Sequence, residues 1–205
     1  MNKTFIKIGA VLALIAMLIF VIPFGLPAQY RVERSTTIDA QPAAIHPSVN
    51  TLQQWPEWSA WTTKKYPDLK NTYAGPESGI GAINEFAAES LGGGRKFEVT
   101  QSHPEEGIEY KLEFQQGGTT YPSTGGIKYA KEGGGTKVTW TNEGELGWSP
   151  ISRWCNALGL MDADMGPDLE TGLAKLKKKV EAEVAAAAER APPEKPADDA
   201  AAENP

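Results

Sequence analysis

Few side chains in this sequence of 205 residues have the types and spacing that acid–base or nucleophilic chemistry needs. His46 and His103 are the only histidines, and each stands directly before a proline, where we expect a solvated loop. They do not have the spacing of a metal-binding pair on one helix. Cys155 is the only cysteine, which excludes a disulfide framework and a cysteine-based metal site. We expect it to be buried like a small apolar residue rather than to act as a nucleophile.

Acidic residues and glycine-rich segments offer no better catalytic candidates. Glu85 and Glu109 alternate with apolar residues, so they should face water rather than a pocket. The glycine runs at 92–94 and 133–135 suit hairpin turns rather than a phosphate-binding loop. The sequence has no nucleophile elbow, P-loop or dinucleotide-binding fingerprint. We therefore predict no catalytic residue, no bound metal and no cofactor.

Tryptophans are concentrated in the segment QWPEWSAW, which holds three of the six, Trp55, Trp58 and Trp61. Each indole carries a large apolar area, so this crowding favours either burial or contact with an apolar ligand. In one interpretation, Trp58 and Trp61 line the route of a ligand into a pocket. In the other, the rings anchor this segment to a sheet edge as part of the core.

The elements that would position these residues are mainly short strands. Apolar and polar residues alternate clearly over 108–115 and again over 137–140, and Gly-rich turns separate several such segments between 81 and 146. An earlier alternating segment lies at 30–38. Short connections and alternation together predict an antiparallel sheet with one apolar face and one wet face.

A long amphipathic helix is predicted after the strands. Its apolar residues recur every three or four positions and share one face: Met165, Leu169, Leu173, Leu176 and Val180. We expect Gly166 to separate this helix from a shorter one before it. A sheet that buries one face against a single long helix is an α+β arrangement.

Both ends of the chain differ in character from this central part. Residues 8–30 carry no charge, which is long enough for a membrane-spanning helix, and Lys3 and Lys7 favour a cytoplasmic N-terminus. We predict a signal anchor over residues 1–28 that leaves the remainder on the periplasmic or extracytoplasmic side. A cleaved signal peptide is the alternative. Residues 185–205, rich in Ala, Pro and Glu, should extend the helix and then become disordered.

The charge balance argues against a nucleic-acid partner. The net charge is −6, and no basic surface large enough to follow a phosphate backbone is indicated. Lysines are frequent over 175–179, but on the outer face of a helix they are expected to be solvated.

Five segments, taken in order, resemble one known family: YRVERSTTIDAQPAAI, WPEWSAW, GPESGIGA, TKVTWTNEGEL and MGPDLETGLAKLKKKVE. This is the polyketide cyclase/dehydrase and lipid-transport family of the START-related, helix-grip superfamily (SRPBCC). The resemblance implies a helix-grip fold over residues 29–184. In that fold a curved antiparallel sheet wraps around the long C-terminal helix and leaves an apolar cavity between them.

Alternation and helix periodicity, placed on that fold, assign the wall of the cavity. The middle of the sheet is the expected location, since the fold tends to leave it unfilled. The predicted ligand-binding residues are Trp58, Trp61, Asn84, Phe86, Phe97, Tyr110, Leu112, Phe114, Tyr129, Trp140, Leu169 and Leu173. Tyr110, Tyr129 and Asn84 would orient the polar end of a ligand.

The function that the resemblance implies is membrane-anchored binding of a hydrophobic or amphiphilic small molecule, such as a lipid. Two alternatives stay open. One is a cyclase- or dehydratase-like enzyme acting on a polyketide-like or aromatic substrate, which would need convergent polar groups in the cavity. The other is a non-catalytic interaction module whose cavity is filled by its own side chains.

Overall fold

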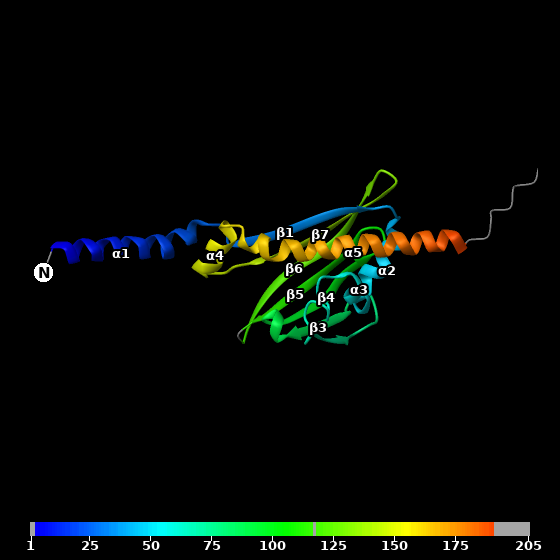
Figure 1. Ribbon diagram of the computed structural model, residues 1–205, viewed down its shortest axis with the longest axis horizontal. Coiled ribbons are helices and arrows are strands. Elements are labelled where there is room, and N and C mark those ends of the chain that lie inside the picture. The colour runs from blue at the N-terminus through cyan, green and yellow to red at the C-terminus, as the bar shows by residue number, and fades with distance from the viewer. Residues whose placement is uncertain (1–2, 117, 191–205) are drawn as a thin grey trace, which may run out of the picture.

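The computed structural model describes residues 3–116 and 118–190 (Figure 1). Its strands are β1 (Gln29–Ile38), β2 (Lys70–Ala74), β3 (Ile83–Ala88), β4 (Gly93–His103), β5 (Gly107–Gln116), β6 (Thr119–Glu132) and β7 (Gly135–Glu145). Its α-helices are α1 (Lys3–Val21), α2 (Pro42–Asn50), α3 (Trp55–Trp58), α4 (Pro150–Ala157) and α5 (Leu160–Arg190). Three 3-10 turns complete the elements: η1 (Ile22–Gly25), η2 (Leu52–Gln54) and η3 (Glu89–Leu91).

All seven strands form one antiparallel sheet in the order β1-β7-β6-β5-β4-β3-β2. The first strand pairs with the last, from Gln29 opposite Glu145 to Ile38 opposite Thr136. The sheet curves beneath α5, which runs along it (Figure 1). The predicted α+β helix-grip architecture is therefore confirmed.

The apolar face of α5 packs on the sheet through Leu169, Leu173, Leu176 and Val180, which are all buried. Burial of such a face supplies most of the stability of a helix in a folded protein. Gly172 lets the helix approach closely, because a Cβ there would lie 2.6 Å from the Trp140 ring.

The predicted break at Gly166 is wrong. The helix α5 begins at Leu160 and continues through Gly166, and the chain turns instead at Gly159, whose φ of 74° is left-handed. A glycine stands at 166 because the Arg34 guanidinium lies against the helix there. Arg34 donates hydrogen bonds to Asp162 at 2.7 Å and Glu170 at 2.5 Å, and so ties β1 to the first turns of α5.

His46 also differs from expectation. We expected a solvated loop, but His46 is buried within α2, which continues through Pro47. Burial of its helix neighbours Ile45 and Val49 outweighs the preference of a pre-proline residue for extended backbone. His103, the other histidine, is exposed at the end of β4.

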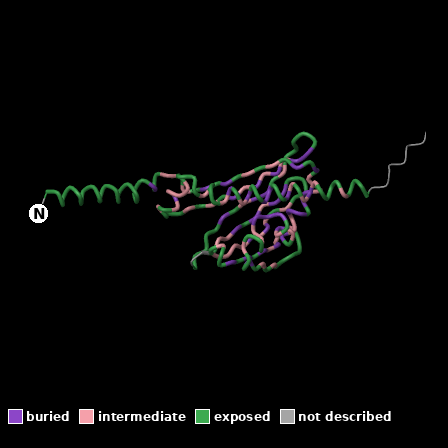
Figure 2. Tube along the Cα trace, in the orientation of Figure 1, coloured by how far each residue is buried: buried purple, intermediate pink, exposed green. Residues whose placement is uncertain are grey.

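The apolar N-terminal segment forms one helix that extends away from the domain and is exposed along its length (Figures 1 and 2). The stretch Lys3–Gly25 is long and apolar enough to cross a membrane, a property that a signal sequence shares. At the opposite end of the domain, α5 continues to Arg190. The disorder predicted for the last residues falls on 191–205, outside the described residues.

Candidate ligand-binding site

A half-open pocket of about 880 Å³ lies between one end of the sheet, α4 and the first turns of α5. Its sheet residues are Tyr30, Arg95, Phe114, Tyr121, Pro122, Asn142 and Glu145. Its helix residues are Ile151, Ser152, Cys155, Met161, Asp164, Met165, Asp168 and Leu169. Connecting segments add Trp61, Lys65, Tyr66, Leu91, Leu146, Gly147, Trp148 and Ser149, along with Ser90. This volume and mixture of apolar and polar groups are typical of small-molecule sites.

The pocket lies toward the sheet end because the middle is occupied by aromatic rings. Trp58 packs on Trp140 with ring centroids 5.3 Å apart, and Trp55 lies 5.1 Å from Phe97 and 6.0 Å from Tyr110. The Trp55 indole donates to the Val49 carbonyl at 2.9 Å, so this cluster is satisfied without a ligand. Nearer the start of α5 the helix presents only half-buried methionines, and space remains beside them.

Three of the predicted ligand-binding residues line this pocket: Trp61, Phe114 and Leu169. The other nine do not. Trp58, Phe97, Tyr110, Leu112, Trp140 and Leu173 are fully buried core residues, and Phe86 stacks on Phe97 at 5.8 Å. The position of the pocket thus follows from which part of the apolar face is already filled by side chains.

The polar groups predicted to orient a ligand, Tyr110, Tyr129 and Asn84, lie outside the wall of this pocket and contact other side chains of the protein. Tyr110 accepts a 2.8 Å hydrogen bond from the Trp140 indole, and burial raises the pKa of its hydroxyl. The Tyr129 hydroxyl lies 3.5 Å from Nδ1 of His46, and burial raises the pKa of this tyrosine as well. Asn84 is buried and its amide donates to Asn71 at 3.4 Å, but its Oδ1 has no hydrogen-bond partner among the described residues.

Other polar residues, which sequence reasoning missed, reach the pocket. Asn142 is only 2% exposed, and its Oδ1 has no hydrogen-bond partner among the described residues. The hydroxyl of Tyr30 lies nearby on the neighbouring strand, and burial raises its pKa. A buried amide oxygen without a partner costs free energy, which a ligand donating a hydrogen bond to it would offset.

Arg95 supplies the positive charge in the wall. Its guanidinium lies 4.6 Å from the centre of the Phe114 ring and donates to the Gly94 carbonyl at 2.9 Å. Burial lowers the pKa of this group. Within residues 3–116 and 118–190, no carboxylate comes within ion-pair distance of it.

The sequence did carry a signal for these residues. Arg95 stands two positions before Phe97, and Asn142 stands two positions after Trp140, so each shares a sheet face with a core aromatic. A polar residue that alternation places on the apolar face of a strand points toward the interior, so it is a candidate for the wall of a cavity.

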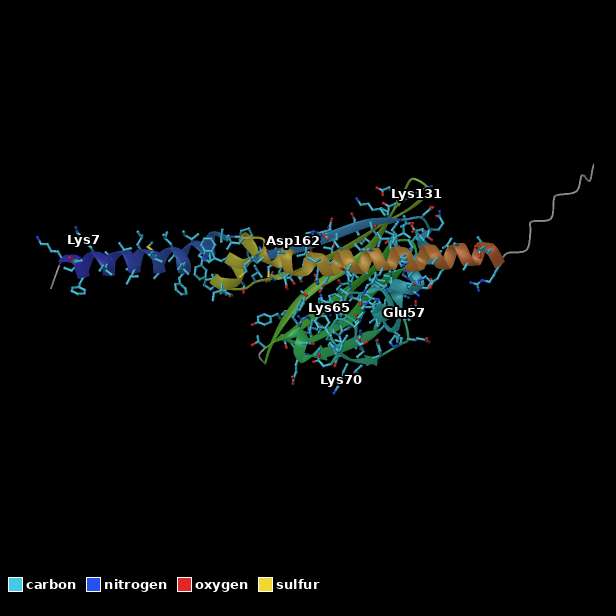
Figure 3. The ribbon with its side chains drawn as sticks, viewed as in Figure 1. Lys7, Glu57, Lys65, Lys70, Lys131 and Asp162 are labelled. Atoms are coloured by element: carbon cyan, nitrogen blue, oxygen red, sulfur yellow. The ribbon has the colours of Figure 1, made fainter. Side chains whose placement is uncertain are left out.

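The rim of the pocket is charged. Lys65, labelled in Figure 3, forms an ion pair of 2.5 Å with Asp168 and thereby links the loop after Trp61 to α5. Glu145 and Asp164 add exposed carboxylates. Both signs of charge therefore surround the opening, while Arg95 lies deeper.

Cys155 differs from its expected burial. It is partly exposed on α4 and lines the pocket, because the buried side of that short helix is taken by Arg153. Neither histidine lines the pocket. Among the described residues, no cluster of His, Cys, Asp and Glu could hold a metal ion.

Comparison with known families agrees with this architecture. The chain matches the family model described as polyketide cyclase / dehydrase and lipid transport over residues 29–181. The protein belongs to this family. Membership indicates binding of a small-molecule ligand or a cyclase-like role.

Solved structures show the same fold at low sequence identity. A protein from Chromobacterium violaceum is 15% identical, with a TM-score of 0.52 over 74% of this chain and 98% of its own. A protein from Rhizobium leguminosarum is 17% identical, with a TM-score of 0.53 over 73% of this chain and 95% of its own. A protein from Staphylococcus epidermidis is 15% identical, with a TM-score of 0.53 over 75% of this chain and 91% of its own. At these identities the likeness is one of fold alone. No curated protein matches the sequence.

Proposed function

We propose that this family member binds one amphiphilic, lipid-like molecule in the pocket while α1 anchors it in a membrane. The observation that carries the proposal is the buried Asn142 side chain, which belongs to the wall of a pocket of mixed polar and apolar character and whose Oδ1 has no hydrogen-bond partner among the described residues. A polar group in that position is stabilised when a ligand supplies the missing partner.

The apolar part of the ligand would lie against Trp61, Phe114, Met165 and Leu169. Removing its surface from water contributes about 25 cal/mol per Å², or about 0.8 kcal/mol for each buried methylene group. A pocket of about 880 Å³ lies within the range of drug-sized sites, so an acyl chain or a small fused-ring system would fit.

The polar part would face Arg95 and Asn142. A guanidinium binds a carboxylate or phosphate through two parallel hydrogen bonds, whereas the unpartnered Oδ1 of Asn142 accepts and therefore needs a ligand group that donates, such as a hydroxyl. The exposed carboxylates of Glu145 and Asp164 disfavour a second anionic group near the opening. We therefore favour an amphiphile with a single acidic group and a hydroxyl close to it.

The anchor and the domain have separate parts in this proposal. Residues 1–28 would hold the protein in the membrane, and the domain over 29–184 would lie on the extracytoplasmic side. The apolar length of Lys3–Gly25 supports the anchor. Tethering would raise the effective concentration of the pocket near membrane-derived ligands.

The two alternatives find less support. A cyclase- or dehydratase-like enzyme would need convergent acid–base groups, but both histidines lie outside the pocket wall and its carboxylates lie at the rim, where Asp168 is paired with Lys65. A filled interaction module agrees with the aromatic centre of the sheet, but not with the space that remains beside α4.

Photoaffinity labelling of the full-length protein in phospholipid vesicles tests the proposal. A diazirine-bearing fatty acid should label the peptide that contains Met161 and Met165, and excess unlabelled fatty acid should compete for it. Labelling of α1 by the part of the probe that is dissolved in the bilayer serves as an internal control, which should not be competed. Labelling confined to α1 would contradict a ligand in the pocket.

A further inference from the structure

We propose that α4 and the residues around it form a membrane-docking surface through which the pocket exchanges its ligand directly with the bilayer. This inference rests on the proposed function and adds the source of the ligand. The surface, here called the α4 collar, comprises Phe24, Trp148, Ile151, Leu158 and Leu160. Its occupant is the interfacial layer of the bilayer that holds α1.

The α4 collar is unusually apolar for exposed surface. Trp148 is 80% exposed, Ile151 70% and Leu158 68%. Ile151 lies in the first turn of α4, while Trp148 and Leu158 lie just outside the two ends of the helix. Phe24 extends the patch, with its ring centre 5.7 Å from that of Trp148. A contiguous exposed patch of this kind marks an interaction site.

Hydrogen bonds fix the α4 collar to the end of the apolar segment. Arg153 is buried and donates to the carbonyls of Phe24 and Leu26 at 3.3 Å, and to that of Gly147 at 2.8 Å. The Trp154 indole donates to the Ile19 carbonyl at 2.9 Å, and Ile19 lies inside the stretch that could span a membrane.

The position of α4 follows from these bonds. Figure 1 shows α4 beside the domain-proximal end of α1, while α5 leaves the domain at the other end. When α1 spans a bilayer, α4 must therefore lie at the level of its surface. Tryptophans are enriched at that depth because the ring is apolar and the N–H can still bind a polar partner.

Charge distinguishes a bilayer from other partners. Between Leu146 and Met161 the only charged residue is Arg153, whose guanidinium is engaged by backbone carbonyls. The next charged residues, Asp162 and Asp164, are acidic. Docking would thus be hydrophobic, would need no anionic lipid, and would change little with salt.

The same helix connects the membrane to the pocket. Ile151, Ser152 and Cys155 of α4 line the pocket wall, as do Trp148 and Ser149 just before the helix. An amphiphile leaving the bilayer beside α4 would reach the pocket without crossing bulk water, which removes the cost of exposing its apolar part.

Depth measurement on the full-length protein in phosphatidylcholine vesicles tests the docking surface. In a Cys155→Ser background, an environment-sensitive fluorophore is attached at Leu158→Cys or, as a matched control, at Ile80→Cys. Ile80 is also exposed, but its neighbour Gly79 bonds to Asn50 of α2, away from α4. We expect lipid-attached nitroxide to quench the label at 158, and aqueous iodide to quench it about fivefold less than at 80. Equal iodide quenching at both positions would overturn the proposal.

A transfer assay separates this inference from the proposed function. The double variant Leu158→Glu, Leu160→Glu should take up a fluorescent fatty acid from vesicles about tenfold more slowly than the parent. Capture of the same fatty acid from a cyclodextrin carrier should stay within about twofold, since neither residue lines the pocket. If the double variant takes up the fatty acid from vesicles as fast as the parent and captures it normally from cyclodextrin, only the docking proposal is contradicted. If the parent itself takes up no fatty acid from either source, ligand binding is contradicted.

Discussion

The Trp140 indole donates a 2.8 Å hydrogen bond to the Tyr110 hydroxyl, and both side chains are fully buried at the middle of the sheet. Each polar atom is thereby satisfied by the other, so neither is available to a ligand. Trp58 covers the pair from α3. Between the sheet and α5 there is therefore a packed aromatic centre and, at one end, an open pocket with room for a ligand.

Closure of the centre depends on Gly172. Alanine there would place a Cβ 2.6 Å from the buried Trp140 ring, so we expect Gly172→Ala to lower the free energy of unfolding by about 1–3 kcal/mol. Gly166→Ala is the control on the same helix: its Cβ would meet the far end of the Arg34 side chain, which can shift at the cost of weakening its exposed ion pairs with Asp162 and Glu170, so its loss should be smaller, up to about 1 kcal/mol. Urea denaturation of both variants measures the difference, and equal losses would argue against the packed centre.

Asn142 should contribute to ligand affinity and not to stability. In Asn142→Leu the buried amide without a partner is replaced by an apolar side chain of similar size, so the free energy of unfolding of the ligand-free protein should stay equal or rise. Affinity for an acidic amphiphile that also carries a hydroxyl donor, such as a hydroxy fatty acid, should fall about tenfold. Fatty-acid titration with parallel denaturation measures both quantities. A large loss of stability without loss of affinity would show that the amide serves the fold.

Trp58 and Trp61 should behave differently although they are three residues apart. Trp58 is completely buried, so Trp58→Ala should lower the free energy of unfolding by about 3–5 kcal/mol. Trp61 is half-buried in the pocket wall, so Trp61→Ala should cost only about 1–2 kcal/mol and weaken ligand binding. Thermal unfolding and fatty-acid titration distinguish the two. Equal effects on binding would mean that Trp61 is only a core residue.

His46 should make stability depend on pH. Burial lowers the pKa of its imidazole from the ordinary value of 6.5, with a smaller contribution from His103. The unfolded chain therefore gains a proton before the folded protein does, and the free energy of unfolding should fall as pH drops below about 6.5. His46→Gln should flatten this decline. Urea midpoints measured between about pH 7.5 and 5 would show it, and identical slopes for both proteins would contradict it.

The sequence predicted the architecture well because hydrophobic periodicity depends on local geometry. Leu169, Leu173, Leu176 and Val180 recur at helical spacing, and all four pack on the sheet. The break expected at Gly166 was wrong, since the need for that glycine comes from Arg34 on a strand far away in the sequence.

The location of the pocket could not be predicted in the same way. Alternation identifies the face to which a residue belongs but not whether neighbouring rings already fill the space beside it. Gly125 allows Tyr110 to lie close to the sheet, since a Cβ there would come within 2.5 Å of its hydroxyl. Such close approaches depend on residues from several strands, and they decide where the cavity remains.

Native mass spectrometry of the full-length protein released from detergent micelles tests the ligand-binding claim most directly. The wild type should carry one releasable amphiphile. Met165→Trp, which fills the pocket, should lose it, and Ala163→Trp, on an exposed position of α5 outside the pocket wall, should keep it. Bare protein in all three cases, or the same adduct on all three, would contradict a ligand held in this pocket.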